Sequence, residues 1–455
     1  MKVLKFGGTS VGTVASLRNL KAIVDSLGEP AVVVVSALGG LTDKLIATAK
    51  DASSGNESYK ESMTAMAQRH FDIINEMVPD AAKEGVNAQV SELLEQLSAI
   101  YTGLFLIRDL PEKSLSQIVS FGERMSSIIV ANILNNATHL DSLTFMKTEK
   151  WFNRDIASRE LTDQLIKQAI KLPLVKTIVT GGFISKDKDS DEITNLGRGG
   201  SDYTAALIAA SLDADLLEIW TDVDGFMTSD PRIIKSASVI DRMTFIESME
   251  LCSYGAKVIY PPTIYPVFHK NIPIKILNTH NPSAPGTLIT DHAQSLPSCV
   301  RGVSSVKNTA MVMVSGSLAS NIAQINSRSY NAMARNGISI FLVAQPENGV
   351  AFSIALPQSD AMRAAEILED EFKPELNSGE VTRIEVEDNL AVLAVVRESI
   401  KEIKGLGARL VNTLQRDSIS VRAISDGASE TTIALVVPGQ DADHALALVH
   451  DACYL

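Results

Sequence analysis

Short apolar runs rich in β-branched residues recur along the first part of the chain. They are "MKVLKF", "PAVVVVSAL", "VKTIVTGGF", "LLEIWTDV" and "IPIKILNT". Runs of this kind are typical of strands that are buried on both faces of a sheet. Helical patterns lie between them, for example over residues 204–210. This alternation predicts an α/β fold with an open, mostly parallel sheet and helices on both of its faces.

The stretch from about 52 to 135 has a different period. Apolar residues recur there at three- and four-residue spacing, as an amphipathic helix requires; they include Leu93, Leu94, Leu97, Ile100, Tyr101 and Leu104. Pro111 ends this pattern, Ser114 can cap the next helix, and a buried stripe continues as far as Ile129. We therefore expect a helical insertion in the α/β domain.

A segment rich in Pro, Ser and Gly near residues 281–298 predicts a domain boundary. Beyond it, a strand–helix–strand–strand series begins at "TAMVMVSG" and is repeated from "NLAVLAVV", with a final helix at "DADHALALVHDA". Two βαββαβ units fit this pattern. The expected domains are therefore residues 1–295, 300–375 and 385–455.

Composition narrows the class of partner. A chain of 455 residues is long enough for about three domains, and its 45% hydrophobic and 21% charged residues are ordinary for a globular protein. The net charge of −13 argues against nucleic acid or an anionic membrane as partner. A small anionic substrate would therefore need local Lys and Arg residues.

Cysteine and histidine usage predicts no disulfide framework and no protein-bound zinc. Cys252, Cys299 and Cys453 are odd in number and widely spaced, and the seven histidines form no H-x-x-x-H pair. The first residues form a strand rather than a signal peptide, and no apolar run reaches membrane-spanning length. These features together predict a cytosolic protein.

The first motif is "KFGGTS", directly after the first strand. Gly7 and Gly8 allow a sharp turn whose N–H groups can approach a phosphate, and Lys5 supplies a charge for an anion. The stretch is neither of the two standard nucleotide-binding fingerprints. An ordinary strand-to-helix turn is the alternative.

The densest motif is "LGRGGSDYTAA" at residues 196–206. Its glycines open a helix whose first N–H groups can bind an anion, and Arg198 can hold a carboxylate through two parallel hydrogen bonds. The alternative is a capped helix start with Ser201 or Asp202 as N-cap. Capping alone does not require three glycines and an arginine.

Three further stretches carry charges. "WTDVDGFMTSDPR", residues 220–232, follows a predicted strand, where open α/β sheets bind ligands, and it lacks the ligand spacing of a calcium loop. "SFGERMSS" places Glu123 on a mostly apolar helix, with a solvated helix face as the alternative. "YGAKVIYPPT" adds Lys257 as a second charge for a phosphate in transfer.

Taken together, these motifs resemble the aspartate kinase family, which has the amino-acid kinase fold. The resemblance covers essentially the whole chain, because the double βαββαβ tail is similar to the paired ACT regulatory domains of that family. "NPSAPGTLI" and "MELCSYGAKV" resemble most the kinase half of bifunctional aspartate kinase–homoserine dehydrogenases. The dehydrogenase half is not seen, since "GLGARL" at residues 405–410 has Leu410 where a dinucleotide fingerprint needs a glycine.

The resemblance implies roles for individual residues. Lys5 neutralises the phosphoryl group, Asp202 orients the catalytic lysines, and Lys257 assists at the nucleotide phosphates. The implied substrate-binding residues are Ser36, Thr42, Glu123, Arg198, Gly199, Gly200 and Ser201, with Glu123 for the α-ammonium and Arg198 for the α-carboxylate of aspartate. The implied ATP-binding residues are Lys5, Gly7, Gly8, Ser10, Thr221, Asp222, Met227, Asp230, Arg232, Lys257 and Val258. Mg²⁺ is expected to arrive with ATP, bridging its phosphates.

The chain departs from the family pattern at three positions and matches it at a fourth. Met227 stands where tyrosine is frequent, and its thioether can still pack on the adenine ring. Tyr260 stands where the family has histidine. Gln345 matches an effector-contact position of the first ACT repeat, whereas Asp426 replaces a glutamine in the second. A carboxylate there would repel the carboxylate of a threonine or lysine effector.

The sequence thus predicts an ATP-dependent aspartate kinase that forms 4-phospho-L-aspartate, the first step of lysine, threonine and methionine biosynthesis. One alternative is a kinase for glutamate or acetylglutamate. Another is a non-catalytic amino-acid sensor with working ACT domains. Because ACT-like domains pair their sheet edges, we expect a homodimer at least, formed through residues 300–455.

Overall fold

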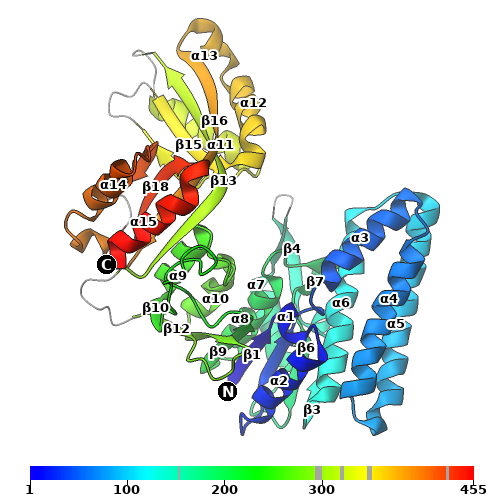
Figure 1. Ribbon diagram of the computed structural model, residues 1–455. Coiled ribbons are helices and arrows are strands. Elements are labelled where there is room, and N and C mark those ends of the chain that lie inside the picture. Colours follow the sequence, from blue (N-terminus) through cyan, green and yellow to red (C-terminus); the bar gives the residue numbers. More distant parts are fainter. Residues whose placement is uncertain (152–153, 293–299, 318–321, 346–350, 427–429, 455) are drawn as a thin grey trace. The chain divides into compact units, whose positions relative to one another are not determined.

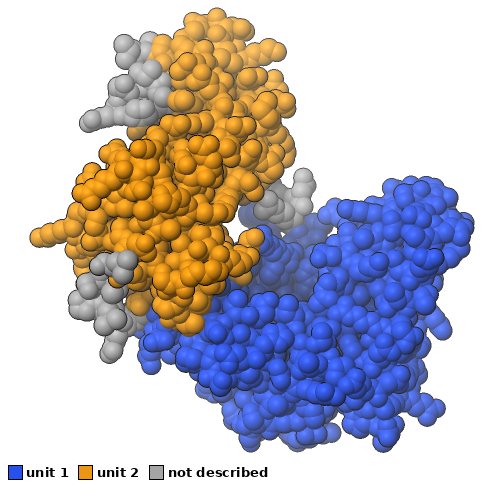
Figure 2. Space-filling view, viewed as in Figure 1, with its two compact units in different colours: residues 1–226, 241–245, 258–293 blue, residues 227–240, 246–257, 294–455 orange. Residues whose placement is uncertain are grey.

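The computed structural model describes residues 1–151, 154–292, 300–317, 322–345, 351–426 and 430–454. Within them the chain forms two compact units (Figure 2). Unit 1 comprises residues 1–226, 241–245 and 258–293, and unit 2 comprises residues 227–240, 246–257 and 294–455. Part of the expected boundary, together with Cys299, lies outside the described residues.

The main sheet of unit 1 has the strand order β10-β12-β11-β9-β1-β2-β6-β3 among the described residues (Figure 1). Neighbouring strands run parallel except for β11 and β12. The strands are β1 (Lys2–Phe6), β2 (Val32–Val35), β3 (Ala137–His139), β6 (Thr177–Gly181), β9 (Leu216–Thr221), β10 (Arg242–Thr244), β11 (Ile274–Asn278) and β12 (Thr287–Thr290). The five apolar runs supply β1, β2, β6, β9 and β11, which confirms the predicted mostly parallel sheet.

The central strands are apolar because neighbouring elements remove both of their faces from solvent. All four valines of β2 are fully buried. β1 lies between β2 and β9, and Lys5 is in register with Val34 on one side and Ile219 on the other. Lys5 is itself only 8% exposed. A charge at this depth needs a partner, because burying an unpaired ammonium is costly.

The helices of unit 1 contact this sheet or one another. They are α1 (Gly8–Val11), α2 (Val14–Asp25), α3 (Leu41–Ser54), α4 (Tyr59–Met77), α5 (Asp80–Ile107), α6 (Glu112–Ile133), α7 (Arg159–Ala169), α8 (Gly200–Ser211) and α10 (Tyr265–Phe268), with single 3₁₀ turns η1 (Ser142–Thr144) and η2 (Pro261–Thr263). Helices α4 and α5 lie side by side in the predicted insertion (Figure 1). Pro111 is the N-cap of α6, so Ser114 lies inside its first turn and does not cap it, contrary to expectation.

Helix α5 is long and apolar enough, by length and composition, to cross a membrane, which corrects the expectation that no run reaches that length. The core helix of a globular protein passes the same test. Buried residues of α5 from Val86 to Leu104 belong to the large hydrophobic core of unit 1, which also includes residues of α3, α4 and α6. The hydroxyl of Tyr101 donates to the carbonyl of Leu45 on α3 over 3.0 Å.

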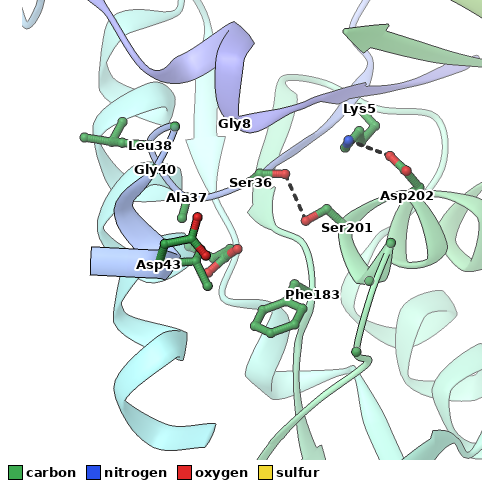
Figure 3. A pocket seen from close by; sticks show the side chains of 16 residues that line it. Lys5, Gly8, Ser36, Ala37, Leu38, Gly40, Asp43, Phe183, Ser201 and Asp202 are labelled. Carbon is green, nitrogen blue, oxygen red and sulfur yellow. Dashed lines mark hydrogen bonds and ion pairs between the residues drawn. The ribbon is translucent and has the colours of Figure 1, made fainter. Parts of the chain in front are cut away.

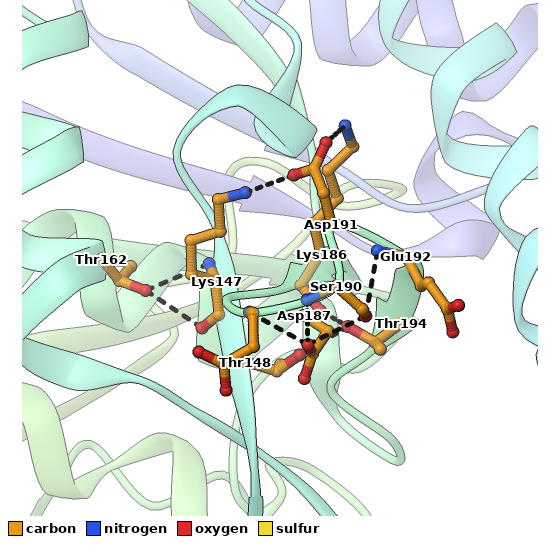
Figure 4. Close-up of polar contacts among 11 residues, drawn as sticks. Lys147, Thr148, Thr162, Lys186, Asp187, Ser190, Asp191, Glu192 and Thr194 are labelled. Atoms are coloured by element: carbon orange, nitrogen blue, oxygen red, sulfur yellow. Dashed lines mark hydrogen bonds and ion pairs between the residues drawn. The ribbon is translucent and has the colours of Figure 1, made fainter.

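A smaller sheet completes unit 1, with the strand order β5-β4-β7-β8. Its strands are β4 (Lys147–Trp151), β5 (Arg154–Ala157), β7 (Ile184–Asp187) and β8 (Ile193–Asn195). The two carboxylate oxygens of Asp191 accept hydrogen bonds from Lys147 and Lys186, each over 2.7 Å (Figure 4). These hydrogen bonds lower the pKa of Asp191 to about 2.

Unit 2 is built on an antiparallel sheet with the order β14-β15-β13-β16-β18-β17 among the described residues. Its strands are β13 (Gly302–Gly316), β14 (Leu342–Ala344), β15 (Ala351–Pro357), β16 (Val381–Val396), β17 (Ala423–Ser425) and β18 (Thr432–Pro438). Its helical segments are α9 (Phe245–Ser253, in unit 2 from Ile246), α11 (Ile322–Arg335), α12 (Ala361–Glu371), α13 (Lys373–Ser378), α14 (Leu406–Arg416) and α15 (Ala442–Tyr454), with 3₁₀ turns η3 (Gln358–Asp360), η4 (Ile400–Glu402) and η5 (Gly439–Asp441).

The two repeats of unit 2 share their long central strands. Residues 309–315 of β13 pair with β15, whereas residues 302–306 pair with residues 392–396 of β16. Val312 accordingly packs in the core with α11 and α12, while Val303 packs in the core with α14 and α15. Residues 302–306 therefore complete the second repeat, although they precede the first along the chain.

Candidate functional site

A cavity of about 390 Å³ opens at the carboxyl ends of β1, β2 and β6 (Figure 3). Ligands of open α/β sheets bind at this edge, because loops that follow neighbouring parallel strands converge there. The cavity is lined by Lys5, Gly8, Ser36, Ala37, Leu38, Gly39, Gly40, Thr42, Asp43, Glu123, Phe183, Gly197, Gly199, Gly200, Ser201 and Asp202. Residues from three of the sequence motifs thus meet in one place.

Lys5 and Asp202 form an ion pair inside this cavity. The Nζ of Lys5, near the end of β1, lies 2.5 Å from Oδ1 of Asp202, in the first turn of α8 (Figure 3). Both residues are only 8% exposed. Electrostatic attraction is stronger in such a partly dehydrated site than in water. The pair therefore fixes an ammonium group where the cavity meets the glycine-rich loop.

Glycines allow the two loops that follow β1 and β2 to touch through their backbones. A Cβ on Gly39 would lie 3.0 Å from the carbonyl oxygen of Gly8, and one on Gly12 would lie 3.2 Å from the nitrogen of Gly39. The carbonyl of Gly12 also accepts a hydrogen bond of 2.8 Å from Arg69 on α4. Side chains at these glycines would force the loops apart.

Helix α8 begins without a side-chain cap. Its N-cap is Gly199 with φ 70°, so neither Ser201 nor Asp202 caps it, and the capping alternative is wrong. A Cβ on Gly182 would lie 2.6 Å from Ser201, so the end of β6 closely approaches this helix. The hydroxyl of Ser36 donates to that of Ser201 over 3.0 Å (Figure 3). The first turn of α8 therefore has no side-chain cap, although the N–H of Gly200 donates to the carbonyl of Gly197 over 3.0 Å.

Glu123 lies on α6 and is only 4% exposed, so the alternative of a solvated helix face is wrong. A Cβ on Gly122 would lie 2.7 Å from that of Ala37, which explains how α6 approaches the loop after β2. Burial raises the pKa of Glu123 to about 8, although the N–H groups of Ala37 and Glu123 itself oppose the shift. Its Oε2 has no hydrogen-bond partner in the described part of the chain. This carboxylate can therefore accept a cationic group.

Arg198 does not line the cavity among the described residues. It is exposed between Gly197 and Gly199, whose φ values of 68° and 70° are left-handed. A Cβ on Gly199 would lie 2.3 Å from that of Tyr260, so this loop packs tightly against the chain at the position where the family has histidine.

Several lining residues were missed from the sequence, and Asp43 and Phe183 have the largest side chains with chemical consequence among them. Asp43 is exposed in the first turn of α3, and Phe183 follows β6 with φ 67°, a rare conformation for a bulky residue. The hydroxyl of Thr204 accepts from the N–H of Phe183 over 3.1 Å, which helps to hold it there. The glycine pair Gly39 and Gly40 after β2 was the available signal for the Asp43 loop.

The predicted nucleotide residues are divided between the units. In unit 1, the hydroxyl of Ser10 is fully buried and shares a hydrogen bond of 2.7 Å with that of Thr279, so it is occupied within the fold. Gly7 donates its N–H to the carbonyl of Trp220. Thr221 ends β9, its hydroxyl donates to Asp222 over 3.3 Å, and Val258 also lies in unit 1.

Unit 2 carries Met227, Asp230, Arg232 and Lys257. The guanidinium of Arg232 binds both carboxylate oxygens of Asp230, through bonds of 2.9 and 2.7 Å. This contact lowers the pKa of Asp230. Lys257 and Arg232 are both exposed, so these charges are open to solvent on unit 2.

The predicted regulatory residues follow the two outermost strands in the order of the unit 2 sheet, β14 and β17, which contact each other. Gln345 follows β14 and accepts a hydrogen bond of 2.8 Å from Asn326 on α11. Asp426 follows β17, and its Oδ2 lies 2.0 Å from where a Cβ on Gly407 would be. Its carboxylate thus sits against the first turn of α14, where a helix attracts anions.

The described residues contain no group of three or more His, Cys, Asp or Glu side chains that could hold a metal ion.

The chain matches two family profiles and is similar to several known proteins. The sequence profile of the amino acid kinase family matches residues 1–278, and an ACT domain profile matches residues 393–453. The chain is 32% identical to the bifunctional aspartokinase/homoserine dehydrogenase of Haemophilus influenzae over 464 residues, covering all of this chain and 56% of that protein. It thus spans about half the length of several curated relatives that it matches.

In two further comparisons the alignment covers nearly all of this chain and of the relative. The chain is 30% identical to lysine-sensitive aspartokinase 3 of Escherichia coli over 461 residues, which is 98% of each chain. A crystal structure of E. coli aspartokinase III in complex with aspartate and ADP superposes with a TM-score of 0.85 at 28% identity, covering all of both chains. These findings confirm the predicted fold, an α/β kinase domain followed by ACT domains.

Proposed function

We propose that this chain, which belongs to the aspartokinase branch of the amino acid kinase family, transfers the γ-phosphate of ATP to the β-carboxylate of L-aspartate. The products are 4-phospho-L-aspartate and ADP. The observation that carries the proposal is the nearly buried ion pair between Lys5 and Asp202, in a cavity that also holds Glu123.

The chemistry asks little of the protein beyond positioning and charge. A β-carboxylate oxygen of aspartate forms a bond to the γ-phosphorus, and the bond from that phosphorus to the β–γ bridging oxygen breaks, so that the electron pair leaves with ADP. Negative charge spreads over the transferred group. Lys5 neutralises that charge, and Asp202 holds the ammonium in place. Lys257 acts in the same way at the nucleotide phosphates.

Aspartate would be recognised through its two backbone-derived charges. Glu123 accepts the α-ammonium, which supplies the hydrogen-bond partner that its Oε2 lacks within the described residues. Arg198 holds the α-carboxylate through its rigid fork of donors. The remaining substrate contacts come from Ser36, Thr42, Gly199, Gly200 and Ser201, all of which line the cavity.

For ATP, Gly7 and Gly8 let the backbone approach the phosphates, and Ser10 supports the turn that presents them. Thr221, Asp222, Met227, Asp230, Arg232 and Val258 are the other proposed nucleotide contacts. Mg²⁺ bound to ATP would neutralise part of the phosphate charge.

Further proposals concern the place of the reaction in the cell and the assembly. We assign the reaction to the cytoplasm and to the first step of lysine, threonine and methionine biosynthesis. The short strands β14 and β17 are the two edges of the described sheet of unit 2, and pairing such edges between chains would give a homodimer. Threonine or lysine is the expected effector, bound near Gln345 or Asp426.

A coupled assay of ADP release over a panel of amino acids tests the proposed reaction. Aspartate should support turnover, whereas glutamate and N-acetylglutamate should support little, because the cavity is bounded by the side chain of Phe183 and by the first turn of α8. Turnover with glutamate or acetylglutamate instead would favour a different amino-acid kinase. Binding of threonine or lysine without any ADP release would favour the sensor alternative.

A further inference from the structure

The segment 227–240, which carries three of the proposed nucleotide contacts, belongs to unit 2 rather than to the sheet of unit 1. It leaves β9 of the unit 1 sheet by way of Gly225 and Phe226 and returns to that sheet at β10. The position of Met227, Asp230 and Arg232 is therefore set by what this segment contacts inside unit 2.

Thr228 is the polar anchor of the segment. Its N–H donates to the carbonyl of Ser238 over 2.9 Å, and its carbonyl accepts from the N–H of Val303 over 2.8 Å. Its hydroxyl accepts from the N–H of Ser238 over 3.1 Å. Thr228 is only 8% exposed. Its bonds to Ser238 close the segment on itself, and its bond to Val303 fixes the segment to β13.

The same hydroxyl contacts His450 on α15, the last helix of the second repeat. Nε2 of His450 lies 3.2 Å from Oγ1 of Thr228. The imidazole is 5% exposed, its ring centroid lies 4.6 Å from that of Tyr454, and burial lowers its pKa. A buried imidazole that lost this partner would leave a polar nitrogen unpaired, which is costly.

A second, apolar anchor lies six residues further along the segment. Ile234 is 5% exposed and belongs to the core of the second repeat, together with Val303 and Leu406. The carbonyl of Asp230 accepts from the N–H of Ile234 over 2.8 Å, so the turn that holds Asp230 is tied to this buried side chain. Asp230 and Arg232 thus lie between two anchors, Thr228 and Ile234, that are both embedded in unit 2.

We infer that Thr228 and His450 are positioning residues for nucleotide binding, through which the packing of α15 sets the affinity for ATP. The inference rests on the proposed function, because the nucleotide roles of Met227, Asp230 and Arg232 do. Neither residue is assigned a contact with the nucleotide. They hold the backbone from which the contacting side chains project, and small displacements of such groups are costly to binding and catalysis.

Two substitutions remove the contact with little change in volume. Thr228→Val deletes the hydroxyl, and His450→Phe keeps an aromatic ring beside Tyr454. His450→Gln is the conservative variant, since its amide can still hydrogen-bond to Thr228. His444→Ala, on the same helix with its side chain 61% exposed, is the matched control.

We expect Thr228→Val and His450→Phe each to raise the KM for ATP and the dissociation constant of ADP, measured by calorimetry, by about three- to tenfold. The KM for aspartate, which is bound by unit 1 residues, should change less than twofold. The double variant should be no worse than Thr228→Val, because that substitution already removes the contact with His450 together with the hydrogen bond from the N–H of Ser238. His450→Gln should stay closer to the unchanged protein, and His444→Ala should match it.

Unchanged ADP affinity in variants with melting temperatures near that of the unchanged protein would overturn the inference. So would an equal rise in the KM for aspartate and for ATP, which is the mark of a general structural defect. If His450→Phe does not fold, Thr228→Val still decides the outcome. ADP binding needs no turnover, so failure of the proposed aspartate reaction would be recognised separately from failure of this inference.

Discussion

The ammonium group of Lys5 lies 2.5 Å from a carboxylate oxygen of Asp202, so the end of β1 is joined to the first turn of α8 by a nearly buried ion pair. The two charges neutralise each other directly after the glycine-rich loop at residues 196–200. A phosphoryl group in transfer would meet the ammonium at this point, and the pair is therefore the first place to test.

Lys5→Ala should lower kcat for aspartate phosphorylation by about a hundredfold or more, with a smaller change in either KM, because the ammonium acts chiefly on charge that develops in the transition state. Steady-state kinetics measure this. Lys2→Ala is the matched control, because Lys2 lies on the same strand and pairs with Glu218 instead. Turnover of Lys5→Ala within a few-fold of the control would remove Lys5 from the mechanism.

Arg198→Lys should raise the KM for aspartate and leave that for ATP nearly unchanged, because lysine keeps the charge and loses the two-pronged geometry. We expect a rise of about tenfold. Arg18→Lys, at an exposed arginine paired with Glu76, should leave both constants unchanged. An equal rise in the KM for ATP would assign Arg198 to the nucleotide.

Glu123→Gln tests the buried carboxyl through pH. Burial raises the pKa of Glu123 in the folded state to about 8, above its ordinary value of 4.5. The protonated Glu123 therefore contributes its full share to stability below pH 4.5, and this contribution is lost as pH rises through about 8. In the absence of aspartate, the melting temperature of Glu123→Gln minus that of the unchanged protein should therefore increase as pH is raised from about 5 to about 8.5, because glutamine does not ionise.

Differential scanning calorimetry at several pH values across that range measures the difference. Glu112→Gln, at the exposed start of the same helix, should show no such trend. Glu123→Gln should also weaken aspartate binding, because glutamine cannot ionise to pair with the incoming α-ammonium. If the difference in melting temperature stayed constant with pH, the conclusion that burial raises the pKa of Glu123 would be wrong.

Alanine at two neighbouring glycines separates backbone strain from crowding. Gly197 and Gly199 have φ values of 68° and 70°, so alanine at either costs about 1–2 kcal/mol. A Cβ on Gly197 meets nothing within 4 Å among the described atoms, whereas one on Gly199 would lie 2.3 Å from that of Tyr260. Gly199→Ala should therefore lose more stability in urea titrations, and more aspartate affinity, than Gly197→Ala. Equal losses would show that the loop yields freely.

Effector binding and assembly can be tested together. Because the carboxylate of Asp426 lies at the first turn of α14, inhibition by threonine or lysine should be weak, and Asp426→Gln should strengthen it. Titration of kinase activity with each amino acid measures this, while light scattering gives the mass. Submicromolar threonine inhibition of the unchanged protein would show that Asp426 is tolerated, and a monomer would remove the proposed interface.

Much of unit 1 could be predicted because its signals are local. The valine-rich runs give the parallel strands, and the glycine motifs stand at their carboxyl ends. The assignment of Lys5 and Asp202 to one site came from the family resemblance of their motifs. Glu123 was harder to place, because a charge on a helix reads equally as a solvated face. Its burial depends on Gly122, which lets α6 approach the loop after β2.

The remaining features depend on contacts between distant segments. Phe183 has a left-handed backbone that its residue type does not suggest. Ile234 reads as an ordinary loop residue after "DPR", and only the fold shows that it lies in the core of the second repeat. Local periodicity likewise does not indicate to which repeat a strand belongs. Residues 302–306 fall within the range expected for the first repeat, but they pair with residues 392–396 of the second.

The two long strands β13 and β16 also govern the order in which the chain can acquire structure. On a ribosome, residues 302–306 are synthesised before any of β16, yet their partners are residues 392–396, and α15, which packs on them, is the last helix. Residues 302–306 therefore cannot pair until the chain has been synthesised through residue 396. Fragments divided between the two repeats would each lack a strand that the other supplies, because residues 302–306 pair with residues 392–396 and residues 309–316 pair with residues 381–390.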